Sequence, residues 1–137
     1  EAYESLDKST LVFSEEGYHL IYSDSYHWSN LVQLSNLRDN HCLMVGLSMT
    51  DPNLRRLLDI SSRNADKTRH FAFMKRLTIE SFSHVKEEQV IDNLDGAQKF
   101  LDRHHNLNEE IMRELGVSII WYTDYEEIPI LLREIRK

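Results

Sequence analysis

The sequence predicts an α/β fold, a partial Rossmann-like domain with a mostly parallel sheet and helices on both faces. Short apolar runs of strand length alternate with segments in which apolar residues recur at helical spacing. This alternation is typical of parallel sheets covered by crossover helices. With 41% apolar and 28% charged residues, the chain has the composition of a globular domain. We expect a single unit over residues 1–137.

Short apolar runs predict the strands, and they lie at residues 11–13, 41–47, 70–74 and 117–122. The run 41–47 is apolar almost throughout, which is typical of a strand buried on both faces. We therefore expect Cys42 to be an inert thiol in the core. This is a small sheet, because sheets usually have about five or six strands.

Capping residues and apolar spacing predict the first helices. Ser14 is a good N-cap for a turn that begins at Glu15. The next helix carries apolar residues that we expect to pack inward, at Trp28, Leu31, Val32, Leu34 and Leu37. Asp51 and Pro52 then begin a helix in the favoured way, with a carboxylate cap before a proline.

The second half of the chain predicts three helices. Residues 84–105 have helical character with a bend near residues 95–96, although strand and loop patterns mix over residues 76–95. Asn106, with Glu109 three residues later, predicts the start of a separate short helix that ends at Gly116. Pro129 places the start of the last helix close by.

The segment from Gly46 to Arg56 is the most informative for function. It runs from a strand through a small polar loop into a helix, and ligands bind at such strand ends in open parallel sheets. Ser48, Thr50 and Asn53 could hydrogen-bond sugar hydroxyls, and a helix N-terminus favours phosphate. A purely structural interpretation stays open, because the carboxylate of Asp51 would compete with a phosphate for the same N–H groups.

Other chemical candidates are weaker. Adjacent His104 and His105 point about 100° apart on a helix, so they cannot easily share a metal. Arg55 and Arg56 are interpreted as a solvated helix face, although Arg55 lies close enough to the helix start to contact a phosphate. Lys75 and Arg76 follow a predicted strand and could lie near the same site.

Charge and cysteine content exclude several classes of protein. The net charge of −7 argues against direct binding of nucleic acid, which depends on many Lys and Arg residues. Cys42 is the single cysteine, so we expect a reducing compartment such as the cytoplasm. No apolar run approaches the roughly 18 residues of a membrane span, so no membrane partner is expected.

Three ordered motifs carry a resemblance to a known family. They are Leu11 to His19, Trp28 to Leu34 and Gly46 to Leu58, and they resemble the bacterial sirtuin-like domain family. The segment from Trp121 to Pro129 is also similar to the end of that domain. The resemblance implies a Rossmann-like domain that binds NAD, as substrate or ligand, without a metal. Several members cleave NAD to nicotinamide and ADP-ribose in defence against bacteriophage.

The resemblance assigns cofactor-binding roles to Gly46, Ser48, Asp51, Asn53, Tyr122 and Asp124. Gly46 and Ser48 match the small-residue segment that lies against the phosphate and ribose of NAD. Asp51 and Asn53 fall on the family's Asp-Pro-Asn motif. Tyr122 and Asp124 correspond to the adenine side of the ligand.

Some family features have no counterpart in this chain. The Gly-rich nucleotide loop, the catalytic Asn and the His-Gly of the family all precede the Val-Phe-Ser-Glu-Glu motif, and none occurs here. We therefore expect residues 1–137 to form the C-terminal part of the domain, with no catalytic residue of its own and no NAD hydrolysis alone. Apolar surface left by the missing half would favour homo-oligomers.

Two other functions stay open. The first is a catalytically silent sirtuin-like module that senses nucleotides or supports assembly. The second is an unrelated α/β regulatory domain without a ligand. Neither requires the domain to cleave NAD.

Overall fold

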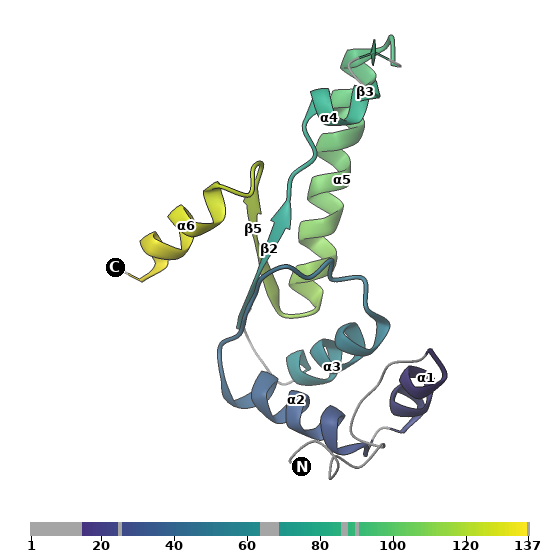
Figure 1. Cartoon of the computed structure of the whole chain (residues 1–137), viewed down its shortest axis with the longest axis vertical. Coiled ribbons are helices and arrows are strands. Elements are labelled where there is room, and N and C mark those ends of the chain that lie inside the picture. The colour runs from purple at the N-terminus through teal and green to yellow at the C-terminus, as the bar shows by residue number, and fades with distance from the viewer. Residues whose placement is uncertain (1–14, 25, 64–68, 86–87, 90, 137) are drawn as a thin grey trace, which may run out of the picture.

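A computed structural model of the chain describes residues 15–24, 26–63, 69–85, 88–89 and 91–136. Its centre is a parallel sheet in the order β1-β2-β5, formed by Leu43–Met44, His70–Lys75 and Val117–Tyr122. Helix α5 (Leu94–Glu114) runs along one side of the sheet, and α6 (Glu127–Ile135) lies on the other (Figure 1). The predicted α/β architecture with a parallel sheet is confirmed.

The register of β2 and β5 divides their side chains between two faces. His70 pairs with Val117, and Lys75 pairs with Tyr122. Because successive side chains in a strand alternate, Ala72 and Val117 share the face that packs against Met112 of α5. Lys75 and Tyr122 share the opposite face, toward α6. This division decides which side chains can meet at the carboxyl end of the sheet.

Two strand predictions are confirmed and one is largely wrong. The runs 70–74 and 117–122 form β2 and β5, whereas only Leu43–Met44 of the run 41–47 is a strand. Among the described strands it lies at an edge of the sheet, and Leu43 is 40% exposed, so this strand is not buried on both faces. Cys42 precedes the strand and is half-buried, which corrects its placement in the middle of a buried strand. The run 11–13 lies outside the described residues.

Helices α1 (Glu15–Ser23), α2 (Trp28–Asp39) and α3 (Pro52–Ser62) form a group at one end of the sheet (Figure 1). Leu57 and Leu58 of α3 join Leu37 of α2 in the main core. The expected inward stripe of α2 is wrong for three residues, because Trp28, Leu31 and Val32 are about half exposed. Only the part of this helix that faces α3 is buried. Ser14, the predicted cap of α1, lies outside the described residues.

Residues 94–114 form one continuous helix, α5, instead of two. Its N-cap is Asn93, whose side-chain oxygen accepts a hydrogen bond from the amide of Gly96 at 2.8 Å. The predicted break at Asn106 is therefore wrong. The helix continues through Asn106 despite the capping pattern, because His105 before it and Met112 after it are both buried along one face of α5.

The segment between β2 and α5 is also not the helix expected from residue 84 onward. It contains the short helix α4 (Ile79–Ser83) and the antiparallel pair β3 (His84–Val85) and β4 (Glu88–Gln89). Phe82 of α4 stacks on Phe100 of α5 at a ring-centroid distance of 5.4 Å. This small unit lies at the far end of α5 in Figure 1.

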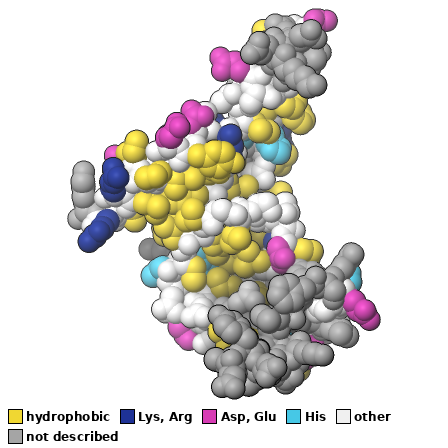
Figure 2. Space-filling view, viewed as in Figure 1, with side chains coloured by type: hydrophobic (Ala, Val, Ile, Leu, Met, Phe, Trp, Pro, Cys, Tyr) yellow, Lys and Arg dark blue, Asp and Glu magenta, His cyan; other side chains and the backbone are white. Residues whose placement is uncertain are grey.

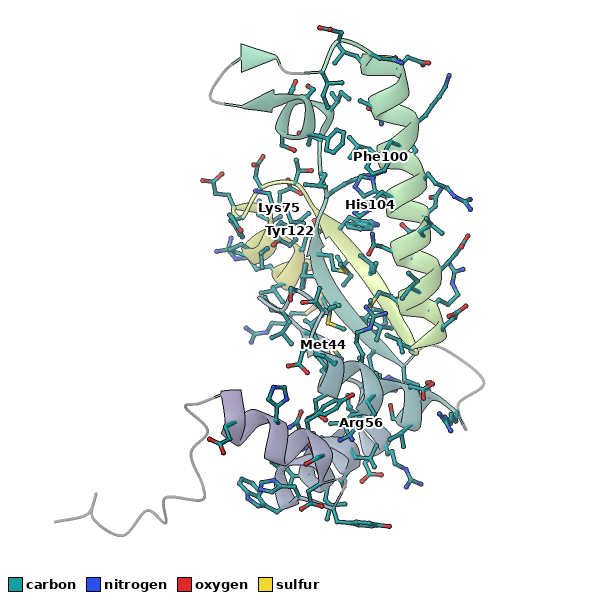
Figure 3. The ribbon with its side chains drawn as sticks, turned by 90° about the vertical axis from the view of Figure 1, so that its right-hand side faces the viewer. Met44, Arg56, Lys75, Phe100, His104 and Tyr122 are labelled. Atoms are coloured by element: carbon teal, nitrogen blue, oxygen red, sulfur yellow. The ribbon has the colours of Figure 1, made fainter. Side chains whose placement is uncertain are left out.

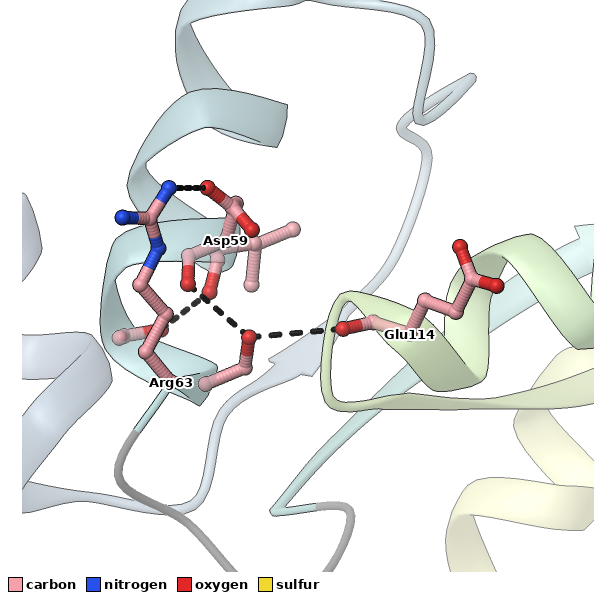
Figure 4. Close-up of polar contacts among 6 residues, drawn as sticks. Asp59, Arg63 and Glu114 are labelled. Atoms are coloured by element: carbon pink, nitrogen blue, oxygen red, sulfur yellow. Dashed lines mark hydrogen bonds and ion pairs between the residues drawn. The ribbon is translucent and has the colours of Figure 1, made fainter.

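A tight turn at Gly116 connects α5 to β5. Gly116 has a φ of +73°, a conformation that glycine adopts without strain, and an added Cβ would lie 3.1 Å from the Cβ of Ser62. The hydroxyl of Ser62, at the end of α3, lies within hydrogen-bond distance of two backbone carbonyls, that of Asp59 in α3 and that of Glu114 at the end of α5 (Figure 4). The ends of α3 and α5 are thereby held together beneath the sheet.

Helix α6 contributes little to the core, since none of its residues is buried. Ile130 is 54% exposed and Ile135 is 57% exposed. Figure 2 shows hydrophobic side chains gathered over α6 and the neighbouring strands. Apolar surface is thus available on this side of the sheet, and the expected self-association stays a prediction.

Candidate functional site

The loop after β1 has a conformation imposed by two residues with positive φ. Gly46 has a φ of +76°, and no atom lies within 4 Å of the position that a Cβ would occupy. Met49 has a φ of 59°, which is uncommon for a residue with a side chain. Its side chain is 1% exposed and packs in the main core, which anchors the loop. Ser48 and Thr50, on either side of it, are exposed and their hydroxyls are hydrogen-bonded at 2.7 Å.

Asp51 caps α3 as the sequence predicts. Its Oδ1 accepts a hydrogen bond of 2.7 Å from the amide of Leu54, and Pro52 takes the first helical position. The carboxylate of Asp51 therefore already uses one of the N–H groups at the N-terminus of α3. A contact between Asp51 and NAD stays a prediction, and the structure shows its capping role.

Asn53 is buried, with 6% of its surface exposed, and its amide group is engaged inside the protein. Its Nδ2 donates to Oδ1 of Asn30 at 2.8 Å, and its Oδ1 accepts from a guanidinium nitrogen of Arg56 at 2.8 Å. Asn53 therefore joins α3 to α2. Its contact with NAD stays a prediction, and its hydrogen bonds place it in a network that joins the helices.

Arg56 is not on a solvated helix face, which corrects the prediction. It is half-buried, its guanidinium lies 4.9 Å from the ring centroid of Tyr22, and it donates to the backbone carbonyl of the same residue at 2.8 Å. Arg56 thus joins α1 to Asn53 of α3, and Asn53 in turn is bonded to Asn30 of α2. The motifs that resemble the sirtuin-like family converge here, because they supply α1, α2 and α3.

A pocket of about 490 Å³ opens at the carboxyl end of the sheet. It is lined by Gly46, Leu47, Ser48, Phe73, Met74, Lys75, Tyr122 and Tyr125. The residues come from the loop after β1 and from the ends of β2 and β5, where parallel sheets bind ligands. Three of the residues predicted to bind NAD, Gly46, Ser48 and Tyr122, are brought together in this lining.

Aromatic rings form the wall of the pocket. Phe73 and Tyr122 have ring centroids 6.5 Å apart, and Tyr122 and Tyr125 are 5.7 Å apart. The ammonium of Lys75 lies 4.8 Å from the ring centroid of Tyr125. Figure 3 shows Lys75 and Tyr122 next to one another at the top of the sheet. The wall therefore offers flat apolar surface beside one positive charge.

The phenol of Tyr122 stays protonated at neutral pH. Burial is the largest cause that raises its pKa, and the charge of Tyr125 and a hydrogen bond with Tyr125 raise it further. A neutral phenol can donate a hydrogen bond to a ligand as well as accept one.

Asp51, Asn53 and Asp124, three of the residues predicted to bind NAD, are not among the residues that line the pocket. Asp124 is exposed, and its amide donates to Oε1 of Glu127 at 2.9 Å, at the start of α6. Glu127 also accepts from the amide of Thr123. Asp124 therefore belongs to the turn between β5 and α6, and its predicted contact with adenine is untested.

Lys75 and Tyr125 are the two polar lining residues that were not among the predicted contacts. The sequence places Lys75 and Arg76 together after a strand and does not say which one faces the site. The register of β2 with β5 decides which of the two faces the pocket. Lys75 pairs with Tyr122 and shares its face, and because side chains alternate along a strand, Arg76 does not. Tyr125 follows β5 by three residues, and no spacing rule indicates that the turn brings it back over the pocket.

The two adjacent histidines of α5 have rings that are steeply inclined to one another. The rings of His104 and His105 have centroids 5.8 Å apart and a steep angle of 64° between their planes. In the part of the chain that the structure describes, no group of three or more His, Cys, Asp or Glu side chains is placed to hold a metal ion. No helix in that part is long and apolar enough to cross a membrane.

Comparison with known proteins relates this chain to a domain family and to a bacterial enzyme. The model of the SIR2-like domain matches residues 4–94 of this chain. NAD(+) hydrolase ThsA of Enterococcus faecium is 29% identical over 133 residues, which are 96% of this chain and 27% of that protein. This chain thus spans about a quarter of the length of that relative.

Proposed function

Because the chain belongs to the SIR2-like domain family, we propose that the pocket at the carboxyl end of its sheet binds NAD. In the intact protein, the domain hydrolyses NAD to nicotinamide and ADP-ribose as part of a bacterial defence against phage. The observation that carries this proposal is the convergence of Gly46, Ser48 and Tyr122 on one pocket. The similarity to NAD(+) hydrolase ThsA supports the same reaction.

The residues of the pocket suit a dinucleotide. The open space beside Gly46 lets a ligand approach the backbone closely. The hydroxyl pair of Ser48 and Thr50 is exposed at the same edge and can hydrogen-bond ribose hydroxyls. The rings of Tyr122 and Tyr125 can lie against a base, since aromatic rings favour stacked contacts.

The chain's own contribution to the reaction is binding and orientation. Its pocket would hold the ligand against the strand ends so that the nicotinamide–ribose bond reaches groups supplied from outside residues 1–137. The charge that develops on the ribose as the bond breaks would be met by a positioned water and a His of that region. We propose that this chain forms the C-terminal part of the domain and does not hydrolyse NAD alone.

One observation favours a second candidate function, a catalytically silent module that senses nucleotides or supports assembly. Among the described residues that line the pocket, none is a carboxylate or an imidazole. General acid–base catalysis relies most often on these groups. The residues of this chain would bind NAD equally well in a sensor as in an enzyme.

The test compares nicotinamide release by the protein that contains this chain with its flanking sequence and by two variants. Ser48→Tyr fills the pocket edge with a ring, and it should lower the rate at least about tenfold because the ligand is displaced. The matched control is Ser35→Tyr on the exposed side of α2, which should leave the rate unchanged. If NAD persists in all three proteins while the unchanged protein still binds it, the silent module is supported and the hydrolase is excluded.

A further inference from the structure

Lys75 supplies the positive charge of the pocket. It is the charged residue among the described residues that line the cavity, and it has no ion-pair partner in the described part of the chain. Its side chain is exposed, so its ammonium is hydrated and available to an incoming anion. The surrounding lining is otherwise neutral, and phosphate is the anionic group that a nucleotide carries.

Tyr125 holds this ammonium in place. The Nζ of Lys75 lies 4.8 Å from the ring centroid of Tyr125, within the range of a cation–π contact. The ring is itself packed beside Tyr122 at 5.7 Å, and Tyr122 is buried against Phe73. A flexible lysine on a short aromatic stack has fewer positions to sample than a free surface lysine. It therefore gives up less conformational freedom when it meets a ligand.

The neighbouring Arg76 cannot take this role. Its amide donates to the carbonyl of Tyr122 at 2.7 Å, which continues the strand pairing, so its side chain is directed to the opposite face of the sheet. Burial is the largest cause that lowers the pKa of His105 of α5, and the charge of Arg76 lowers it further from that face. Two adjacent positive charges are thus separated by the sheet, and only one reaches the pocket.

We propose that Lys75, positioned by Tyr125, recognises a phosphate of the ligand and selects phosphate-bearing nucleotides over nucleosides. This inference rests on the proposed function, because it concerns the same pocket. Lys75 makes no bond and transfers no proton in this role. It sets the affinity order, with ADP-ribose and NAD binding more tightly than AMP, and AMP more tightly than adenosine.

The experiment titrates adenosine, AMP, ADP-ribose and NAD into the 137-residue chain and follows amide chemical shifts at up to millimolar ligand. Lys75→Met should weaken ADP-ribose binding by about five- to tenfold, the effect of one partly exposed charge-assisted contact. It should leave adenosine binding unchanged, so the difference in affinity between ADP-ribose and adenosine becomes smaller. Lys75→Arg should keep most of the affinity, and the control Arg76→Met should keep all of it.

Two further measurements separate charge from shape. Binding of ADP-ribose to the unchanged chain should weaken as salt rises, because salt screens exposed charges, and Lys75→Met should remove most of that dependence. Tyr125→Leu should weaken ADP-ribose binding although the lysine is retained. Tyr125→Phe should not, because it keeps the ring over which the ammonium lies.

The outcomes distinguish this inference from the proposed function. If NAD shifts the amides of Gly46 and Ser48 but Lys75→Met changes neither affinity nor ligand order, the role of Lys75 is wrong and the pocket stands. The role is equally wrong if Arg76→Met weakens binding as much as Lys75→Met. If no nucleotide shifts the pocket amides, the inference and the proposed function are both overturned.

Discussion

The side chains of Asn53 and Asn30 are joined by a hydrogen bond of 2.8 Å inside the group of N-terminal helices. Both residues are nearly inaccessible to solvent, with 6% and 1% of their surfaces exposed. Asn30 also donates to the backbone carbonyl of Asp24 at 2.9 Å. Since Asn53 lies in the first turn of α3, this bond fixes the helix that follows the pocket loop against α2. Asn53, to which the family resemblance attributes ligand binding, thus helps to hold the helices beside the pocket loop together.

Replacement of Asn53 by Ala should lower the free energy of unfolding by about 2–3 kcal/mol, because Asn30 and Arg56 each lose the hydrogen bond that they make with Asn53 inside the protein. Urea unfolding followed by tryptophan fluorescence measures the change. Asn30→Ala should give a similar loss, and the double variant should lose less than the sum of the two. If Asn53→Ala keeps full stability but abolishes NAD binding, Asn53 contacts the ligand and the structural assignment is wrong.

Asp51 should behave as a helix cap. Asp51→Ala should cost about 1 kcal/mol of stability, because the amide of Leu54 loses its acceptor. Asp51→Asn should recover most of this loss, since asparagine is an equally good cap. Thermal unfolding of the three proteins measures the effect. Equal losses in the Ala and Asn variants would show that the negative charge of Asp51, and not its hydrogen bond, is what matters.

Two buried histidines should make the protein sensitive to mild acid. Burial is the largest cause that lowers the pKa of both His70 and His105, and the charge of a nearby arginine lowers each further. The folded protein therefore favours the neutral rings, whereas in the unfolded chain a histidine takes up a proton near pH 6.5. Stability should be complete above about pH 7 and should fall as the pH decreases through about 6.5. Urea midpoints between pH 5 and pH 8 measure this dependence.

The same two residues should differ when they are replaced by Leu. Neither ring nitrogen of His105 has a hydrogen-bond partner among the described residues, so His105→Leu should raise stability at pH 7 by about 1 kcal/mol. It should also reduce the acid sensitivity. His70 accepts a hydrogen bond from the amide of Cys42, so His70→Leu should destabilise the protein. A loss of stability in His105→Leu with unchanged acid sensitivity would contradict this account.

Arg56 should control how firmly α1 is attached. Arg56→Met removes the contact with the ring of Tyr22, the hydrogen bond to the carbonyl of Tyr22 and the hydrogen bond to Asn53. Amide hydrogen exchange in α1 should then speed up by about tenfold or more, since local opening follows the loss of such contacts. Exchange in β2 and β5 should speed up much less. Uniform acceleration over the whole chain would show that Arg56 stabilises the global fold instead.

The sequence predicted the parts of the fold that depend on local rules. The apolar runs 70–74 and 117–122 correspond to β2 and β5, and the Asp51–Pro52 pair marks the start of α3. Tertiary contacts decided the rest. Asn106 has a capping pattern, yet α5 continues through it because burial of His105 and Met112 favours one long helix.

Contact of Gly46, Ser48 and Tyr122 with NAD stays a prediction, although all three line one pocket. Sequence reasoning indicated Gly46 and Ser48 through the strand-end rule and Tyr122 through the family resemblance. It could not separate Lys75 from Arg76, because that choice depends on the register of β2 with β5. Nor could it indicate Tyr125, whose position depends on the turn into α6.

The most direct test of the central claim is a titration of NAD into the isotope-labelled chain, with amide shifts read residue by residue. The account predicts weak but saturable binding that shifts Gly46, Ser48, Lys75 and Tyr122, and that is lost in Ser48→Tyr. A smaller hollow of about 180 Å³, lined by Glu109, Arg113, Val117, Ser118 and Ile119, offers an internal comparison. Shifts confined to that hollow, or no saturable shifts at all, would contradict the account.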